Sequence, residues 1–329
     1  MIITQTPVRV SFLGGGTDYP DYFHKHGGAT LVSTINRYTL ITVHQLTQFV
    51  DHSVRIHYSQ VETVQHVDEI RHPSARGCLQ YLGIDGGVEI HYVNDLPART
   101  GLGSSSSATV GLLMALYAFR GEMVSRERVA QEAVHIEQEI LKERVGCQDQ
   151  YASALGGFLH LEFQRDGGVR ANPMVLPVDR LRFLEERLLL LYTGIQRHAH
   201  EILDEQMERT RSGDATKDLG ELKALVADGV DILARGRDLR DFGALLHEGW
   251  QLKRRLSSKI ALPWIDEQYE RARGAGAIGG KLLGAGGGGF LLLYVEPRDQ
   301  DRVRAALPGL REVRFGFENG GSSVIFYRP

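Results

Sequence analysis

The segment from Pro97 to Ser107 contains the residues best suited to binding phosphate. Its glycines allow a tight turn. The N–H groups at the start of a following helix, together with the positive end of the helix dipole, attract phosphate oxygens. A plain serine N-cap is the alternative, but four consecutive serines exceed what capping needs, so the pattern favours phosphate binding. The candidate residues are Pro97, Gly101, Leu102, Gly103, Ser104, Ser105, Ser106 and Ser107.

Glu137 is a carboxylate on a predicted buried face. A helical wheel over residues 125–142 places it in the middle of an apolar arc. An unpaired carboxylate on such a face is costly, so Glu137 requires a metal ion or a cationic partner. A metal ligand and a structural salt bridge are therefore the two alternatives. The arc consists of Val129, Ala130, Ala133, Val134, Ile136, Ile140 and Leu141.

Asp149 is a second candidate carboxylate, shortly after Glu137 in the chain. It lies in the short segment Gly146-Cys147-Gln148-Asp149, between apolar stretches. Cys147 is either a nucleophile or a small buried thiol, and the buried thiol is the commoner outcome.

The histidines show no zinc motif. The sequence has no H-E-x-x-H, and the pairs His24/His26 and His198/His200 lack companion ligands at metal-binding spacing. We therefore expect no zinc site.

The glycine-rich segment near the end of the chain fits neither of two familiar phosphate motifs. Gly280-Lys281 lacks a Walker A frame, because Ala275 and Leu282 stand where glycine and Ser or Thr are required. The segment 284–289 matches G-x-G-x-x-G, but it precedes a predicted strand instead of opening a helix. It predicts either a crowded loop against other backbone or direct contact with a nucleotide.

The composition narrows the class of protein. The 329 residues are 42% hydrophobic and 24% charged, with 38 Lys plus Arg against 41 Asp plus Glu. This balance is typical of a globular protein and gives no basic excess for nucleic acid or an anionic membrane. Two cysteines make no disulfide framework, and no apolar run is long enough to span a bilayer. With no visible signal peptide, we expect a soluble, cytoplasmic protein.

The elements that must position these residues are mixed strands and segregated helices, which predicts an α+β fold. We expect two domains, at 1–175 and 176–329. Strands are expected at 8–13, 31–43, 54–58, 88–93, 290–295, 312–315 and 323–327. Helices are expected at 105–118, 125–143, 218–235, 238–255 and 263–273.

Taken together, these motifs resemble those of the GHMP kinases, a superfamily of small-molecule kinases. The resemblance covers nearly the whole chain. It rests on Arg9 to Tyr19, on the phosphate loop 97–107, on Gln148-Asp149 and on Lys281 to Gly289. It implies an S5-like N-terminal domain and a ferredoxin-like C-terminal domain, with the active site between them.

The resemblance also implies roles for individual residues. Asp149 would be the catalytic base and Arg9 would orient the reacting hydroxyl, while Ser105 and Glu137 would hold Mg²⁺ beside ATP. Asp18 would bind sugar hydroxyls. The implied substrate-binding residues are Gly15, Gly16, Thr17, Asp18, Tyr19, Arg197, Lys281, Gly286 and Gly287.

Within the superfamily, the chain looks like the D-glycero-D-manno-heptose 7-phosphate kinases. Galactokinases have Glu and His where Gly15 and Gly16 stand here. The implied reaction is phosphorylation of the anomeric hydroxyl to a 1,7-bisphosphate, for lipopolysaccharide or capsule synthesis. The alternatives are an anomeric kinase of an unphosphorylated sugar, like a fucokinase or galactokinase, and an inactive sensor that binds nucleotide or sugar. The oligomeric state stays open, with a homo-oligomer among the alternatives.

Overall fold

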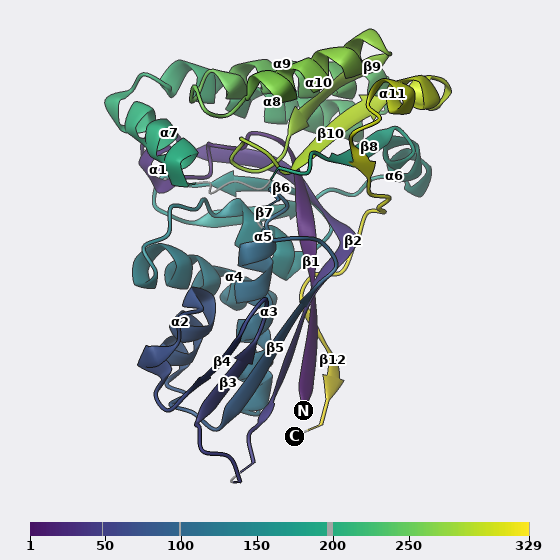
Figure 1. The fold of residues 1–329 in the computed structure, drawn as a ribbon. Helices are drawn as coiled ribbons and strands as arrows, with labels where there is room; N and C mark the ends of the chain where they lie inside the picture. The colour runs from purple at the N-terminus through teal and green to yellow at the C-terminus, as the bar shows by residue number, and fades with distance from the viewer. Residues whose placement is uncertain (48, 99, 196–199, 329) are drawn as a thin grey trace.

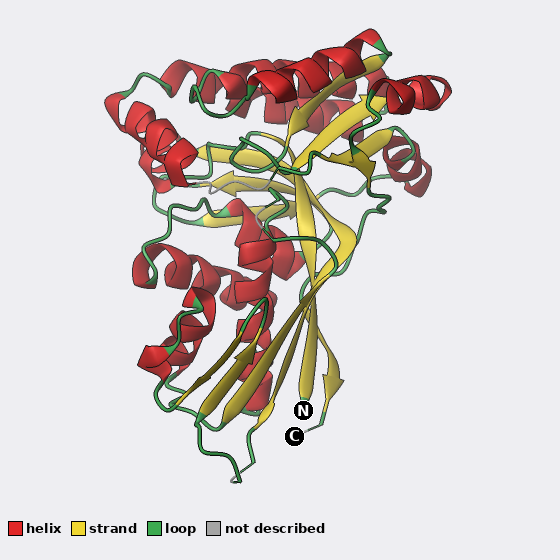
Figure 2. Cartoon of the chain, in the orientation of Figure 1, coloured by secondary structure: helices red, strands yellow, loops and turns green. Residues whose placement is uncertain are grey.

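The computed structural model describes the chain except for residues 48, 99, 196–199 and 329. Two antiparallel-rich sheets, each with helices packed against it, make up the molecule (Figures 1 and 2). The predicted α+β class is confirmed. Every helix among the described residues is too short or too polar to cross a bilayer.

The first sheet has eight strands. Its main path runs β12-β1-β2-β5-β3-β4, and β6 pairs with both β2 and β7. The long strand β2 connects the two ends of this sheet, because its first residues pair with β6 and its later residues pair with β5. The strands are β1 (Ile2–Leu13), β2 (Gly28–Gln45), β3 (Val54–His57), β4 (Val61–Val64), β5 (Val88–Asn94), β6 (Phe158–Phe163), β7 (Val169–Pro173) and β12 (Ser323–Tyr327).

A group of helices covers one face of this sheet. Their apolar side chains pack on alternate residues of the strands, such as Val54, Ile56, Val88 and Ile90, all fully buried. The helices are α2 (Pro73–Leu82), α3 (Ser104–Phe119), α4 (Arg126–His135) and α5 (Gln148–Leu155). The expected single helix over 125–143 is α4 followed by a π-helical turn, Ile136–Ile140, which ends two residues before Lys142, whose φ is 54°.

The second sheet has the order β11-β8-β10-β9 and lies at the top of Figure 1 under α8, α9 and α10. Its strands are β8 (Leu188–Tyr192), β9 (Ala277–Leu282), β10 (Phe290–Val295) and β11 (Arg311–Glu312), so the strand expected over 312–315 is shorter and begins one residue earlier. The remaining helices are α1 (Pro20–His26), α6 (Val178–Glu185), α7 (His200–Ser212), α8 (Thr216–Ala234), α9 (Leu239–Arg254), α10 (Pro263–Gly274) and α11 (Gln300–Ala306). Short 3₁₀ turns lie at Val67–Glu69 and Pro297–Asp299.

The last strand, β12, returns to the first sheet. It pairs antiparallel with the start of β1, so the two ends of the chain lie side by side (Figure 1). The boundary expected near residue 175 separates the strands of the two sheets except for β12, and the division of the chain at that point stays a prediction.

Candidate active site

A cleft of about 1260 Å³ lies where the two parts of the molecule meet. The end of β1, the loop before α3 and the start of α5 line it from the first part, and α9, β9 and the glycine loop after β9 line it from the second. Of the residues expected to bind or react with ligands, thirteen line this cleft: Arg9, Gly15, Gly16, Asp18, Tyr19, Pro97, Gly101, Gly103, Ser104, Ser105, Asp149, Lys281 and Gly286.

The serine-rich loop enters α3 without a side-chain cap. The N-cap residue is Gly103, whose φ of 74° is left-handed, and no side chain accepts a hydrogen bond from the first turn. The alternative of a serine N-cap is therefore wrong. A helix leaves its first N–H groups without intrahelical partners, so this terminus has donors for an anion. Ser104 and Ser105 face the cleft at that point.

The second glycine-rich loop packs its backbone on the first. A Cβ on Gly284 would lie 2.4 Å from the Cα of Gly101, and a Cβ on Gly289 would lie 2.3 Å from the carbonyl oxygen of Thr100. Side chains at either position would separate the loops. Of the two expected roles for 284–289, close packing against other backbone is thus observed, and Gly284, Gly286 and Gly288 also line the cleft.

Arg9 and Asp149 form a bidentate ion pair at the wall of the cleft. Arg9 Nε donates to Asp149 Oδ1 at 2.7 Å and Nη2 donates to Oδ2 at 2.6 Å. The third guanidinium nitrogen donates to the Gly101 carbonyl at 2.6 Å, which ties the pair to the phosphate loop. Arg9 is buried, whereas a quarter of the Asp149 side chain is exposed to the cleft. Parallel hydrogen bonds of this kind fix the orientation of a carboxylate as well as its charge.

Asp18 is buried next to this pair. Its Oδ1 accepts from the Gly16 N–H at 3.0 Å, and Oδ2 lies 1.9 Å from where a Cβ on Gly146 would be. Burial and the nearby Asp149 charge raise the pKa of Asp18, and backbone N–H groups partly oppose that rise. Gly146 is therefore required for close approach of this carboxylate.

Glu137 lies beneath the phosphate loop, in the π-helical turn, and is 1% exposed. Its Oε2 accepts from Ser106 Oγ at 2.8 Å and from Gln150 Nε2 at 2.5 Å. No cationic side chain among the described residues pairs with it, so the expected alternative of a structural salt bridge is not observed. Burial raises its pKa to about 7, although the hydrogen bonds from its neighbours lower it. Its Oε1 has no hydrogen-bond partner within the described chain.

Two lysines are buried on the opposite side of the cleft. Lys281 Nζ donates to the Phe12 carbonyl at 2.8 Å, and Lys253 Nζ donates to the Leu282 carbonyl at 3.2 Å. Burial lowers the pKa of Lys253 to about 8 and that of Lys281 well below its ordinary value, where the charge of Lys253 adds to the effect. Neither ammonium has an acidic side chain at ion-pair distance in the described part of the protein.

The run Lys253-Arg254-Arg255 divides between the cleft and the surface. Arg254 pairs with Asp266 at 2.8 Å and Arg255 pairs with Asp218 at 3.4 Å, both away from the cleft. Only Lys253 of the three lines the cleft.

Other expected site residues lie behind the cleft wall. Thr17 is fully buried and its hydroxyl donates to the carbonyls of Gly14 and Ala29, both at 2.8 Å, so it braces the turn. Ser107 binds the hydroxyl of Thr39 on β2. Those that do not line the cleft are Thr17, Leu102, Ser106, Ser107, Glu137 and Gly287. Arg197 lies outside the described residues.

Two supporting residues, Ser11 and Gln150, were not singled out from the sequence. Gln148 accepts from Ser11 Oγ at 2.8 Å, while Gln150 and Ser106 position Glu137. The two glutamines flank Asp149 on a short helix, so their order in the chain was the available signal. Cys147 is buried, and burial raises its pKa to about 12. It is therefore the small buried thiol that was the commoner expectation, and not a nucleophile.

Known families and structures match this arrangement. The GHMP kinase N-terminal domain model matches residues 70–157, and the GHMP kinase C-terminal domain model matches residues 222–310. A D-glycero-alpha-D-manno-heptose 7-phosphate kinase of Campylobacter jejuni is 30% identical, over 93% of each chain. An L-fucokinase/L-fucose-1-P guanylyltransferase of Bacteroides fragilis is 27% identical over 92% of this chain, which spans 35% of that longer protein.

Among solved structures, a D-glycero-D-manno-heptose 1-phosphate kinase of Bacteroides thetaiotaomicron superposes over 100% of both chains, with a TM-score of 0.81 and 25% identity. The fold expected from the sequence is confirmed by this match. Because both family domain models match this one chain and a relative that is 30% identical covers 93% of it, the protein belongs to the GHMP kinase family and is an ATP-dependent kinase.

Proposed function

We propose that the protein transfers the γ-phosphate of Mg²⁺-ATP to the anomeric hydroxyl of a sugar phosphate, D-glycero-D-manno-heptose 7-phosphate, to give the 1,7-bisphosphate. The observation that carries the proposal is that the Arg9–Asp149 pair and the uncapped start of α3 open into the same cleft. The Arg9–Asp149 pair suits an acceptor hydroxyl, and the free N–H groups at the start of α3 suit phosphates.

The chemistry follows from these positions. The acceptor oxygen attacks the γ-phosphorus as the bond to ADP breaks, and Asp149 accepts the hydroxyl proton. Arg9 holds the Asp149 carboxylate through two hydrogen bonds and adds positive charge beside the transferring group. The first turn of α3 donates to the phosphates of the nucleotide.

The residues present fit Mg²⁺. A buried carboxylate oxygen without a partner, Glu137 Oε1, is a donor that a hard cation satisfies. Glu137 would hold the ion together with a loop hydroxyl, and Ser105 is the one proposed. When bound, Mg²⁺ neutralises charge on the β- and γ-phosphate oxygens.

A phosphorylated substrate fits the two buried lysines. Lys253 and Lys281 are buried and have no acidic partner in the part of the chain that the structure describes, so an anionic group in the cleft would compensate their positive charge. Both heptose kinases described above are named for heptose phosphates, which supports the same class of substrate here. A role in lipopolysaccharide or capsule synthesis and a location in the cytoplasm, where the free thiols of Cys78 and Cys147 stay reduced, belong to this proposal.

A kinase of an unphosphorylated sugar is the second candidate, because the fucokinase relative is 27% identical over most of the chain. The test is ADP release with a panel of free and phosphorylated heptoses and hexoses. We expect the highest kcat/KM with heptose 7-phosphate. Equal efficiency with free heptose would favour the second candidate, and no turnover with any sugar would favour a sensor.

A further inference from the structure

Three histidines and a glutamate gather on the face of the first sheet that the helices do not cover. Strands β2, β3 and β5 alternate in this region, with Val43, Ile56 and Ile90 buried toward the helices. The residues between them point the other way. His44 lies opposite Glu89 across the β2–β5 pair, and His57 lies beside His91 across the β3–β5 pair.

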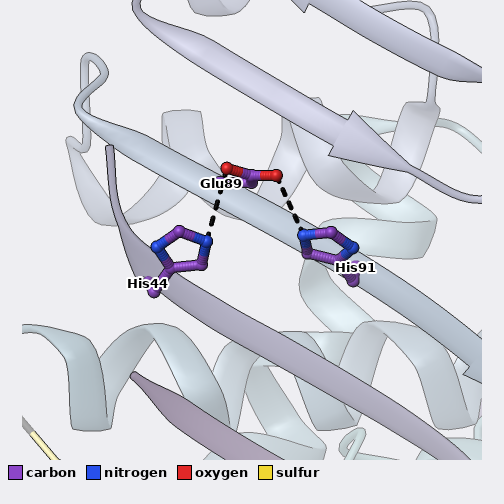
Figure 3. Close-up of side chains that lie close together, drawn as sticks. All are labelled: His44, Glu89 and His91. Atoms are coloured by element: carbon purple, nitrogen blue, oxygen red, sulfur yellow. Dashed lines mark hydrogen bonds and ion pairs between the residues drawn. The ribbon is translucent and has the colours of Figure 1, made fainter. Parts of the chain in front are cut away.

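The side chains converge on the Glu89 carboxylate. His44 Nε2 lies 3.3 Å from Oε2, and His91 Nε2 lies 3.0 Å from Oε1, on either side of the carboxylate (Figure 3). The ligand atoms of His44, Glu89 and His91 all lie within 4.8 Å of one another. The Glu89 side chain is only 10% exposed, whereas His44 and His91 are 38% and 36% exposed, so the cluster is open to solvent on one side.

The orientation of His44 suits a metal ligand. Its Nδ1 lies 3.0 Å from the Gln45 carbonyl, which can only accept, so Nδ1 carries a proton. In the neutral ring, Nε2 then carries a lone pair that points at the Glu89 carboxylate. A cation between His44 Nε2 and Glu89 Oε2 would stabilise this arrangement. A backbone carbonyl that fixes the tautomer in this way is the usual outer partner of a metal-binding histidine.

The distances also agree with a small cation. Zinc binds nitrogen and oxygen ligands at about 2.0–2.2 Å, so the ligand atoms of a tetrahedral site lie roughly 3.3–3.5 Å apart. The contacts of Glu89 with His44 and His91, at 3.3 and 3.0 Å, need to lengthen by no more than a few tenths of an ångström to reach that spacing. The two histidine nitrogens lie within 4.8 Å of each other, so the rings must turn toward a shared ion. We propose that His44, Glu89 and His91 form a site for a divalent transition-metal ion of the zinc class, with water completing the coordination from the open side.

Two neighbours modify this site. The His57 ring stacks on His91 at 4.2 Å between ring centroids, with an angle of 4° between planes, and so restrains the ligand. His57 Nε2 also lies 3.1 Å from Glu89 Oε1, the oxygen that His91 contacts. Arg55 Nη1 lies 3.6 Å from Glu89 Oε2 and competes with a cation for the same carboxylate. Removing the Arg55 charge should therefore tighten metal binding, an effect that a purely structural ion pair would not produce.

The site is separate from the cleft chemistry. Tyr92 on β5 and Tyr58, which directly follows β3, line the cleft, but none of the three ligands does. No zinc site is expected from the sequence, because the ligands lie on two separate strands and form no recognisable spacing motif. Only the pairing of β2 with β5 brings His44 next to Glu89.

The experiment is a calorimetric titration of tag-free, nucleotide-free protein with Zn²⁺, repeated with Co²⁺ as a spectroscopic probe. We expect one ion per chain and the visible absorption of a four-coordinate Co²⁺ site. H44Q, E89Q and H91Q should each weaken Zn²⁺ binding by about tenfold or more, and R55Q should strengthen it severalfold. H160Q, which changes a histidine elsewhere on the same sheet, and E137Q, beneath the phosphate loop, should bind as the wild type does.

The proposal is overturned if the wild type binds neither ion at about 100 μM, a weak limit for a site with three protein ligands. It is also overturned if E137Q alone abolishes binding, which would place the ion in the cleft, or if the three ligand variants bind like the wild type. Should a ligand variant fail to fold, the Co²⁺ spectrum of the wild type decides, because a six-coordinate spectrum contradicts the site.

Discussion

The charged side chains in and beside the cleft differ in whether they have an oppositely charged partner. Arg9 and Asp149 satisfy each other through two short hydrogen bonds. Among the described residues, Glu137 is a buried carboxyl group that accepts hydrogen bonds from Ser106 and Gln150 but has no cationic partner, and Lys281 is a buried lysine that donates to the Phe12 carbonyl but has no acidic partner. Leaving a charge buried without an opposite partner costs stability. In the proposed function, ligands supply the opposite charge at these two places: a cation at Glu137 and an anion at Lys281.

Breaking the Arg9–Asp149 pair should have the largest effect. D149N keeps the shape and one hydrogen bond of the side chain but cannot accept a proton. Because general base catalysis contributes about 10²–10⁴-fold, kcat should fall by that factor while ATP affinity stays the same. Steady-state kinetics and nucleotide binding measure the two effects. D228N, an exposed aspartate on α8, is the matched control. If D149N keeps most of its kcat at saturating substrates, Asp149 is not the base, and Asp18 becomes the next carboxylate to test.

Neutralising the unpaired anion should also stop turnover. E137Q keeps the volume and the contacts with Ser106 but removes the charge that attracts Mg²⁺. We expect kcat to fall about 100-fold or more, with partial recovery at high Mg²⁺. A large loss of thermal stability with activity retained would show instead that Glu137 is structural.

Variants of Ser105 and Ser106 distinguish a loss of the proposed metal ligand from a loss of the hydrogen bond that positions Glu137. Ser105 is exposed in the cleft, whereas Ser106 is buried and donates to Glu137. If Ser105 is the metal ligand, S105A should lower kcat about 100-fold, and S106A, which only loosens Glu137, by about tenfold. Kinetics over a range of Mg²⁺ concentrations compare the two variants. A larger loss in S106A would transfer the metal ligand to Ser106.

The unpaired cation is tested by K281M. A charge-assisted hydrogen bond to phosphate is worth about 1.5–3 kcal/mol, so KM for heptose 7-phosphate should rise about 10- to 100-fold. The KM for ATP should change little. K217A, an exposed lysine on α8, serves as the control. A rise in KM for ATP alone would assign Lys281 to the nucleotide.

The smallest expected effect is on stability. Burial raises the pKa of Glu137 from 4.5 to about 7, so the folded protein binds more protons than the unfolded chain between those values. The unfolding free energy should therefore decrease as pH rises from about 5 to about 7 in EDTA, by an amount that lowers Tm by a few degrees. E137Q should lose this part of the pH dependence in calorimetry, and Mg²⁺ should reduce it in the wild type. An identical pH profile for E137Q would contradict the buried, unpaired state of Glu137.

Local patterns predicted some of these features and could not predict others. The burial of Glu137 follows from helical periodicity, because one helix determines which residues share a face. The position of Lys253 in the cleft does not follow from such a pattern, because Arg254 and Arg255 are also basic. Only the packing of α9 decides which of the three lies in the cleft. Thr17 shows the same limit: the motif marks it as a substrate contact, but its hydroxyl is occupied by backbone carbonyls of the neighbouring turn. His44 and Glu89 meet only through strand pairing.

The return of β12 to β1 has a consequence for biosynthesis. The first sheet gains this edge strand from residues 323–327, long after β1 (Ile2–Leu13) has been synthesised. Until then, the start of β1 presents unpaired N–H and C=O groups on one edge, which is the usual template for misassociation. A nascent chain of this protein thus exposes this edge of β1 until β12 has been made and pairs with it, and a chaperone that shields strand edges would act in that interval.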